Sequence, residues 1–316
     1  MSRALRRGAS YVQNTMLRCL VSPMATQIGG HKPGGINEGM LALDSEPTAD
    51  HLDGLVLKPV QTGQRGAREV SLYEAMTQGD AYWLRMPITT TTRKNFAGLV
   101  PFLCNYHGVV ALGPQMRHIV LADCTDHMSR PCVLDVKLGT RTAEHIAPMK
   151  KQRSTLAKYP CQSELGCRLV GMRVWSQCES KYLEYDKLWG FSLRDKAAIR
   201  QGLVDFLGGF LEFADKQNLI ADLSRRIRAL LDWFEGQDQL VFISSSLLLV
   251  YDGGNDGNSN TPKCVPLTQL KIIDFAHVRK EDSPDYGYIA GLRMVAQLLG
   301  DISKSEGGRR PPFDRC

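Results

Sequence analysis

The sequence predicts an α+β protein of two lobes, a small one built on an antiparallel sheet and a larger mixed one. Three observations lead to this prediction. Short apolar segments of strand length, separated by turn residues, dominate the chain up to about residue 122 and surround one helix. Longer segments with helical spacing are more frequent after that point. A length of 316 residues suits two lobes that share a cleft.

The smaller lobe is expected over residues 27–122. Its first clear strand is 55–60, which ends at the turn residues 62–66. A helix is expected over about 67–78, where apolar residues recur at helical spacing. The sheet is completed by two further strands, at 108–112 and 118–122.

The larger lobe is expected over residues 123–316 and contains more helix. A basic stretch, 141–158, lies between its first two strands and is expected to give a short helical segment over about 141–165. A loop rich in Gly and Asn, 253–260, indicates a hairpin. In chain order we expect strands at 133–138 and 167–175, helices at 194–216 and 222–236, a hairpin joining 240–251 to 270–278, and a helix at 288–299.

The positive charge of the chain lies mostly at its N-terminal end. Residues 1–37 hold five Lys and Arg and no acid, out of a formal net charge of +6, so the remainder is nearly neutral. We expect residues 1–26 to be a disordered basic extension. Mitochondrial targeting by this segment, or a true start at Met24, are the alternatives. The body shows no stripe of basic residues and aromatics, which argues against nucleic-acid binding.

The cysteine content and the lack of long apolar runs indicate the cellular compartment in which the protein is expected. Nine scattered cysteines without a C-x-x-C pair indicate a reducing compartment, the cytoplasm or the nucleus, and neither a disulfide framework nor a zinc site. No apolar run approaches the roughly 18 residues that a membrane span requires. With 43% hydrophobic and 23% charged residues the chain is typical of a globular protein. We expect a monomer.

An acid and a base lie two residues apart on the strand within 131–139. Because alternate side chains of a strand share a face, Asp135 and Lys137 point together to one side, and Leu134 and Val136 point into a core. Phosphoryl transfer needs such a pair: a carboxylate orients or deprotonates the attacking hydroxyl, and a cation stabilises the transferring group. A solvated Asp–Lys pair on a surface strand is the alternative.

Three further signals follow in the order of a two-lobed kinase. Asp274 lies among apolar strand residues, where a carboxylate needs a cation or a metal such as Mg²⁺ beside it. Lys58 on a strand and Glu69 on the next helix match the pair that places a cation on ATP phosphates. The hydroxyls of 244–246 are either metal ligands or a turn motif. Each signal alone is also compatible with a purely structural role.

Several short motifs occur together between residues 27 and 300. P-x-x-x-D-x-K-x-G covers residues 131–139, S-S-L-L covers 245–248 and I-D-F covers 273–275. The H-R-D and A-P-E motifs of protein kinases are absent, and no G-x-G-x-x-G precedes Lys58, which argues against a protein substrate. The motifs resemble the inositol polyphosphate kinase family. That resemblance implies a bilobal kinase-like fold and the use of ATP and Mg²⁺ to phosphorylate a soluble inositol phosphate. Agreement extends to Gly30-His31, Arg65-Gly66, Arg68-Glu69, Gly171–Val174, Asp285–Tyr288 and Gly291-Leu292.

The resemblance also implies roles for individual residues. Asp135 and Lys137 would face the acceptor hydroxyl and the γ-phosphate. Asp274, together with Ser246, would hold Mg²⁺. The ATP site would consist of Lys58 at the phosphates, Glu69 positioning it, the hinge backbone at Leu121 and Cys124 beside adenine, and Asp123 near the ribose.

The segment after Gly139 bears on which inositol phosphate is used. It is basic, and converging cations suit a polyanion, although a solvated basic helix is the alternative. Its short length resembles the multikinase branch, which acts on tris- to tetrakisphosphates towards the pentakisphosphate. The sequence of 138–141 is instead similar to the hexakisphosphate kinases, which make pyrophosphates. The expected substrate contacts are Lys150, Lys151, Arg153, Lys158 and His277.

One position departs from the family pattern. Phe191 stands where relatives often have arginine, so any substrate preference that depends on that arginine does not transfer. A non-catalytic scaffold that binds inositol phosphates is a further reading. It is disfavoured because Asp135, Lys137 and Asp274 are all retained, although buried charged groups would serve no purpose in a scaffold.

Overall fold

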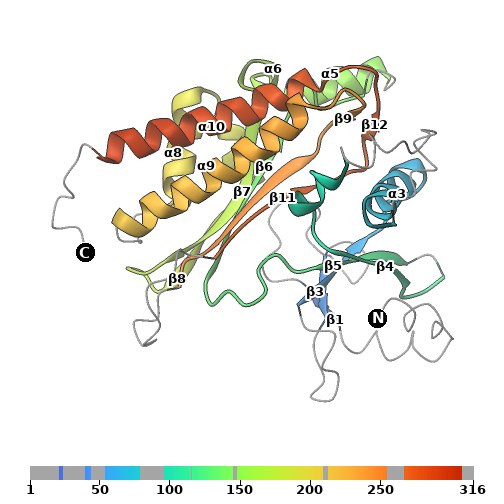
Figure 1. The fold of residues 1–316 in the computed structure, drawn as a ribbon, viewed down its shortest axis with the longest axis horizontal. Coiled ribbons are helices and arrows are strands. Elements are labelled where there is room, and N and C mark those ends of the chain that lie inside the picture. Colours follow the sequence, from blue (N-terminus) through green and yellow to red (C-terminus); the bar gives the residue numbers. More distant parts are fainter. Residues whose placement is uncertain are drawn as a thin grey trace.

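The computed structural model describes eight parts of the chain, which form two lobes (Figure 1). Much of the expected N-terminal extension, the lead-in to the first lobe and most of the Gly/Asn-rich loop lie outside them. The described residues are 21–23, 40–43, 54–78, 96–114, 116–144, 148–208, 213–254 and 267–307.

The first lobe is an antiparallel sheet that carries one long helix. The helix α3 (Gln64–Gln78) follows β3 after a turn and packs against β4. A side chain at Gly66 would meet the carbonyl oxygen of Gln61 at 1.9 Å, so only glycine allows this tight start of the helix. A 3-10 turn, η2 (Val100–Phe102), precedes β4. The strand order is β1 (Val21–Pro23), β2 (Leu41–Leu43), β3 (Leu55–Pro59), β5 (Arg117–Ala122), β4 (Tyr106–Ala111).

Strand β1 lies inside the segment that was expected to be a disordered extension. It pairs with β2, so Val21 lies opposite Leu43 at the edge of the first sheet. Three residues of the basic N-terminal segment therefore belong to the sheet.

The second lobe is a five-stranded antiparallel sheet with helices on one face. Its order is β11 (Thr268–Ile273), β10 (Ser246–Asp252), β6 (Pro131–Leu138), β7 (Cys167–Ser176), β8 (Lys181–Tyr185). Strand β6 is central, and its residues from Cys132 to Val136 are buried. Figure 1 shows α8 (Lys196–Phe206), α9 (Phe213–Glu235) and α10 (Tyr286–Gly307) lying across the sheet. The remaining elements are α5 (Met149–Lys158), α6 (Gln162–Leu165), α7 (Lys187–Ser192), β9 (Leu240–Phe242) and β12 (Val278–Lys280).

The main hydrophobic core of the described residues runs through both lobes, and a small second cluster around Leu57 and Leu112 lies in the first lobe. The main core includes Val56 and Leu72 of the first lobe and extends to Ile302 at the end of α10. Tyr73 of α3 stacks on Tyr106 with ring centroids 5.4 Å apart and meets the ring of Phe275 edge-on at 5.2 Å. The predicted α+β arrangement of two lobes is confirmed.

The helical part of the second lobe differs from the prediction in its boundaries. The helix expected over 194–216 ends at Phe206, because Gly208 adopts a left-handed φ of 67° that closes the helix. The helix α9 begins at Phe213, nine residues before the expected start at 222. The helix α10 continues through Gly300 to Gly307, since Ile302 beyond that glycine is fully buried and offsets its low helix propensity.

The predicted hairpin is interrupted on both arms, and strand β8 was missed. Between β9 and β10 the extended backbone is interrupted at Ser244, with φ 62°. Between β11 and β12 it is interrupted at Asp274, with φ 67°. Strand β10 pairs with β11 and β9 with β12, so the two breaks face each other across the ribbon. Left-handed backbone at a non-glycine residue is unusual and occurs most often at functional sites.

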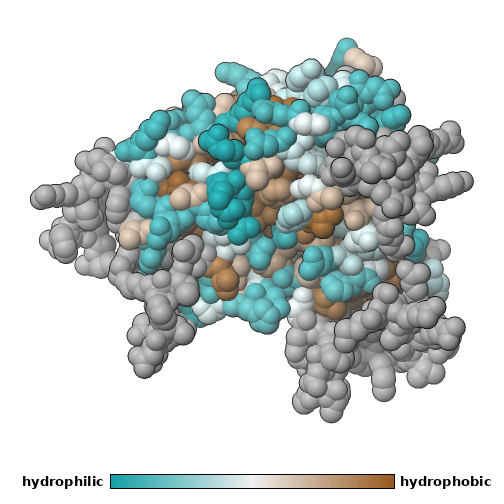
Figure 2. Space-filling model, viewed as in Figure 1, coloured by the Kyte–Doolittle hydropathy of each residue, from teal (hydrophilic) through white to brown (hydrophobic). Residues whose placement is uncertain are grey.

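The surface shown in Figure 2 is mostly hydrophilic, and its hydrophobic atoms occur in small separate areas. Within the described ranges no helix combines the length and apolar composition needed to cross a membrane.

Asp285 joins the start of α10 to β9, which gives a stability prediction. Its carboxylate accepts the backbone N–H of Phe242 at 2.6 Å and of Tyr288 at 3.0 Å, and the side chain is buried. Because Asp285→Ala leaves both donors unpaired, we expect a loss of about 2–4 kcal/mol in the free energy of unfolding, measured with urea. The control Asp195→Ala removes one exposed cap bond, to Ala198 at 2.8 Å, and should cost about 1 kcal/mol. Equal losses in the two variants would contradict the assignment.

Candidate active site

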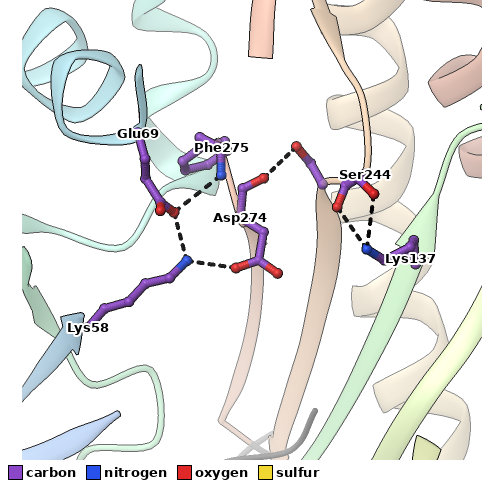
Figure 3. A network of polar contacts seen from close by, with 7 residues as sticks. Lys58, Glu69, Lys137, Ser244, Asp274 and Phe275 are labelled. Carbon is purple, nitrogen blue, oxygen red and sulfur yellow. Dashed lines mark hydrogen bonds and ion pairs between the residues drawn. The ribbon is translucent and has the colours of Figure 1, made fainter. Parts of the chain in front are cut away.

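A lysine from the first lobe bridges two carboxylates from different elements. The Nζ of Lys58 lies 2.6 Å from Oε1 of Glu69 on α3 and 2.6 Å from Oδ1 of Asp274 (Figure 3). Glu69 is fully buried, and its Oε1 also accepts the backbone N–H of Phe275 at 3.2 Å. The predicted Lys58–Glu69 pair is therefore present, and it extends across the lobes to Asp274.

This bridge keeps Lys58 charged. Burial by itself lowers the pKa of Lys58, but the carboxylates of Asp274 and Glu69 more than offset burial and raise the pKa above its ordinary value. Burial also acts to raise the pKa of Asp274, and the charges of Lys58 and Lys137 outweigh it and lower that pKa. The Lys58 ammonium and the Asp274 carboxylate therefore stay charged at neutral pH.

The break at Ser244 positions the second cation of the site. The Nζ of Lys137 donates to the carbonyl oxygen of Ser244 at 3.1 Å and to its Oγ at 3.3 Å (Figure 3). Ser245 donates through its Oγ to the carbonyl oxygen of Asp274 at 2.8 Å, which ties the two breaks together. Burial lowers the pKa of Lys137, whereas the charges of Asp274 and Asp135 oppose that shift.

Asp135 is a buried carboxyl group with a raised pKa. The residue is 5% exposed, and its Oδ1 is buried without a hydrogen-bond partner in the described part of the chain. Burial and then the negative charge of Asp274 raise the pKa of Asp135 to about 6, while Lys137 acts in the opposite direction. A carboxylate with such a pKa can accept a proton from a hydroxyl near neutral pH.

The oxygen atoms near Asp274 fit a hard cation. The side chain of Asp274 is 43% exposed, which leaves its carboxylate open to the site. The Oγ of Ser246 is buried next to the carboxyl group of Asp135, and its hydrogen bond acts to lower the pKa of that group. Mg²⁺ takes oxygen ligands and usually completes its shell with phosphates and water. That completion is needed here, because the described ranges contain no cluster of three or more His, Cys, Asp or Glu side chains that could hold a metal alone.

The predicted hinge residues connect the two sheets. Leu121 is a buried residue of β5, and Asp123 follows the end of that strand on the way to β6. The Asp123 carboxylate accepts from the backbone N–H and the Oγ of Thr125, both at 2.7 Å, so in this structure it stabilises its own turn. The Sγ of Cys124 lies 3.1 Å from the Sγ of Cys104. The contacts of these residues with adenine and ribose stay predictions.

The predicted substrate residues lie on two different elements. Lys150, Arg153 and Lys158 are exposed on α5, and the side chain of Lys151 lies outside the described atoms. His277 follows the break at 274 and meets Glu144, with Nδ1 and Oε1 2.5 Å apart.

Glu144 was not foreseen as a member of the site. Besides meeting His277, it forms an ion pair with Arg68 of α3 at 3.0 Å. Burial acts to raise the pKa of Glu144, but the hydrogen bond to His277 and the charge of Arg68 lower it. This acid therefore links the first lobe to the segment that follows β6.

Arg168 is another residue that the sequence interpretation missed. It lies on β7 opposite Lys137 of β6, and it is 8% exposed. Its guanidinium stacks on Phe191 at 4.2 Å and lies 5.5 Å from the ring of Tyr159. Burial lowers the pKa of Arg168, whereas the charge of Asp135 opposes this shift, so the two groups act on each other. An arginine inside the apolar segment 167–174 was the available signal.

Known proteins with similar sequences belong to one family. The family model of inositol polyphosphate kinases matches residues 118–300. The human inositol polyphosphate multikinase is 30% identical over 235 residues, which are 74% of this chain and 51% of the human protein. The inositol polyphosphate multikinase of japonica rice is 29% identical over 299 residues, 89% of this chain and 94% of the rice protein. The human inositol hexakisphosphate kinase 3 is 30% identical over 219 residues, 60% of this chain and 52% of that protein.

A solved structure shares the fold. The inositol phosphate multikinase Ipk2 from S. cerevisiae, solved in complex with ADP and Mn²⁺, superposes with a TM-score of 0.61 at 22% identity. The superposition covers 78% of this chain and 98% of the yeast chain, and it confirms the kinase-like fold. The chain spans about half the length of the two human relatives. Because the family model matches more than half of the sequence, the chain belongs to the inositol polyphosphate kinase family.

Proposed function

We propose that this chain is an ATP- and Mg²⁺-dependent kinase of soluble inositol polyphosphates, with tris- and tetrakisphosphates as substrates and the pentakisphosphate as the end product. The observation that carries the proposal is the bridge from Lys58 to Glu69 and Asp274, beside the buried pair Asp135 and Lys137. This set supplies a cation for nucleotide phosphates, oxygen ligands for a metal and a base for an acceptor hydroxyl. The names of the human and rice multikinases support the same activity.

The nucleotide binds between the lobes. Lys58 holds the ATP phosphates, and Glu69 keeps its ammonium in place through the 2.6 Å ion pair. The backbone of 121–124 contacts adenine. Asp274 and Ser246 would hold Mg²⁺, whose charge would offset that of the phosphates.

The transfer step uses the two side chains of β6. Asp135 accepts the proton of the attacking hydroxyl, since its pKa of about 6 leaves it mostly ionised at pH 7. Lys137, held by its hydrogen bond to Ser244, stabilises the negative charge on the phosphoryl group in the transition state. Because both groups are rigidly held, the site is organised before the substrate arrives.

Arginine and lysine side chains of β7 and α5 bind the inositol phosphate. Arg168 provides a buried guanidinium next to Asp135, and the exposed lysines and arginine of α5 provide further charge. His277 joins them once a substrate phosphate replaces Glu144. Phe191 occupies the place of the usual family arginine, and its ring supports Arg168 instead.

The alternative activity is phosphorylation of the hexakisphosphate to a pyrophosphate, favoured by the similarity to the human hexakisphosphate kinase 3. A non-catalytic scaffold is the other alternative. We place the enzyme in the cytoplasm or nucleus as a monomer, with free cysteines at the six described positions.

Product analysis separates these functions. Purified protein with Mg-ATP should phosphorylate inositol tris- and tetrakisphosphates, detected by chromatographic separation of the products. Turnover of the hexakisphosphate alone would favour the pyrophosphate-forming enzyme. Binding of ATP without turnover of any inositol phosphate would leave only the scaffold.

Asp135→Asn tests the base and its cost to stability in one variant. Turnover should fall by roughly 10²–10⁴-fold because no group accepts the hydroxyl proton. At pH 7.5 the metal-free variant should be more stable than the parent by about 2 kcal/mol, because a buried carboxylate with a raised pKa destabilises the folded state above that pKa. The gain should shrink as the pH falls from about 6 towards 4, where the folded and unfolded parent both bind the proton.

Two companion variants make the Asp135→Asn result specific. Lys137→Ala should also abolish turnover while the chain remains folded. Asp205→Asn, on α8, where the carboxylate accepts a hydrogen bond from the side chain of Gln201, should leave turnover unchanged. Near-normal turnover by Asp135→Asn would refute the role of this carboxyl group as the base.

Arg168 and Arg173 form a matched pair on β7. Arg168→Gln should raise KM for the inositol phosphate about 10-fold and leave KM for ATP nearly unchanged, since it removes one charged contact to a substrate phosphate. Arg173 stacks on Tyr182 at 3.5 Å and pairs with Glu184, so Arg173→Gln should change neither constant. Steady-state kinetics with both substrates varied would measure this. Equal effects of the two variants would show that Arg168 supports only the strand.

A further inference from the structure

Cys104, in the segment that precedes β4, contacts Cys124, in the connection between the two lobes. The Sγ atoms of Cys104 and Cys124 are 3.1 Å apart, although the residues are 20 positions apart in the sequence. Cys104 is 7% exposed, and Cys124 is partly exposed. A disulfide requires a separation of about 2.05 Å, so the two sulfur atoms need to approach by only about 1 Å.

The neighbourhood of the pair is fixed from both sides. Ala122 donates its backbone N–H to the carbonyl oxygen of Asn105 at 2.9 Å, which places the two segments side by side. Lys271 of β11 donates through Nζ to the carbonyl oxygens of Pro101 and Leu103, both at 3.0 Å. The segment that carries Cys104 is therefore held between the hinge of the first sheet and the sheet of the second lobe.

The pair also lies beside the proposed nucleotide site. The charges of Lys58 and Asp123 both act on the Cys104 thiol. Cys104, Cys124, Glu69 and Asp274 all act on the buried hydroxyl of Tyr73. The cysteines are therefore close to the lysine bridge, and Cys124 belongs to the connection that is expected to contact adenine.

We propose that Cys104 and Cys124 form a reversible disulfide when the protein meets hydrogen peroxide, and that this cross-link weakens nucleotide binding. The cross-link is a property of the fold alone, whereas its effect on the nucleotide rests on the proposed kinase function. Drawing Cys124 towards Cys104 displaces the backbone after Asp123. Because adenine recognition uses that backbone, a displacement of this size disturbs its hydrogen bonds.

The reaction balances with peroxide as the oxidant. The Cys104 thiolate attacks one peroxide oxygen, the O–O bond breaks, and the departing hydroxide takes up the proton that Cys104 released, giving a sulfenic acid and water. The Cys124 sulfur then attacks the Cys104 sulfur. The S–S bond forms, the S–O bond breaks, and the hydroxyl leaves with the Cys124 proton as a second water. Two thiols are oxidised and one peroxide is reduced.

The environment of Cys104 favours it as the attacking thiol. The hydrogen bond from Cys124 lowers the pKa of Cys104, burial opposes this shift, and the charges of Lys271 and Lys58 assist it. The same contact, followed by burial, raises the pKa of Cys124. One sulfur of the pair is thus prepared to ionise while the other keeps its proton, which suits an attacking and a resolving thiol.

Thiol mapping of the full chain tests the cross-link. Protein reduced and then treated with peroxide should lose two free thiols and yield a peptide pair joined through Cys104 and Cys124 in non-reducing mass spectrometry. Cys104→Ser and Cys124→Ser should each abolish this pair. Cys178→Ser, which removes an exposed cysteine, should leave it intact. Oxidation of Cys178 without a link between Cys104 and Cys124 would overturn the proposal.

ADP titration of the same samples tests the consequence. We expect the oxidised parent to bind ADP about 10-fold more weakly than the reduced parent, as for the loss of about one hydrogen bond, and dithiothreitol should restore the affinity. Cys104→Ser should show no effect of peroxide on ADP binding. Unchanged affinity in a fully cross-linked sample would overturn the regulatory role. Reduced protein that binds no ADP would instead refute the proposed kinase function, and the thiol map would still decide the cross-link.

Discussion

The ion bridge from Lys58 to Glu69 and Asp274 is the interaction on which the rest of this site depends. Glu69 is fully buried, and a carboxylate in that position is tolerated only beside a cation and hydrogen-bond donors. Lys58 and the backbone N–H of Phe275 meet this requirement from different lobes. Removing the lysine would leave a buried uncompensated charge, so this contact fixes the position of the Lys58 ammonium and holds α3 against the second lobe.

The bridge also explains why the ribbon of the second lobe is interrupted where it is. A continuous strand through Asp274 would extend the β10–β11 pairing and direct alternate side chains to opposite faces. The left-handed residues Ser244 and Asp274 instead end that pairing. The carboxylate of Asp274 then reaches Lys58, and the carbonyl oxygen of Ser244 reaches Lys137. Two local backbone irregularities thus bring residues 244 and 274 into contact with lysines of strands β3 and β6.

The sequence was sufficient to predict those parts of the molecule that the local pattern of apolar and charged residues determines. The apolar strand around Asp135, the lysine of β3 and the acid of α3 stand out because charged residues interrupt apolar periodicity. The break at Asp274 was not predicted, since this residue lies in an apolar segment that has the pattern of a continuous strand. The serines at 244–246 had indicated a turn as one alternative, and Ser244 does lie in a turn with left-handed backbone. Arg168 and Glu144 were missed for a different reason. Their importance arises from long-range contacts, to Lys137, Phe191 and His277, which sequence spacing does not reveal.

The charges around Asp135 explain how this residue can keep a raised pKa, as a proposed base requires, although cations for a polyanionic substrate lie nearby. Lys137 and Arg168, which are proposed to meet phosphate groups, both act to lower the pKa of Asp135. Burial and the neighbouring charge of Asp274 outweigh them, so the pKa of Asp135 is raised to about 6. Arg168 illustrates the same balance, because its guanidinium rests on the Phe191 ring rather than pairing with Asp135 at short range. An arginine at position 191 would replace this stacking with a second positive charge beside the Arg168 guanidinium, so the aromatic ring is what allows Arg168 to remain buried there without a competing cation.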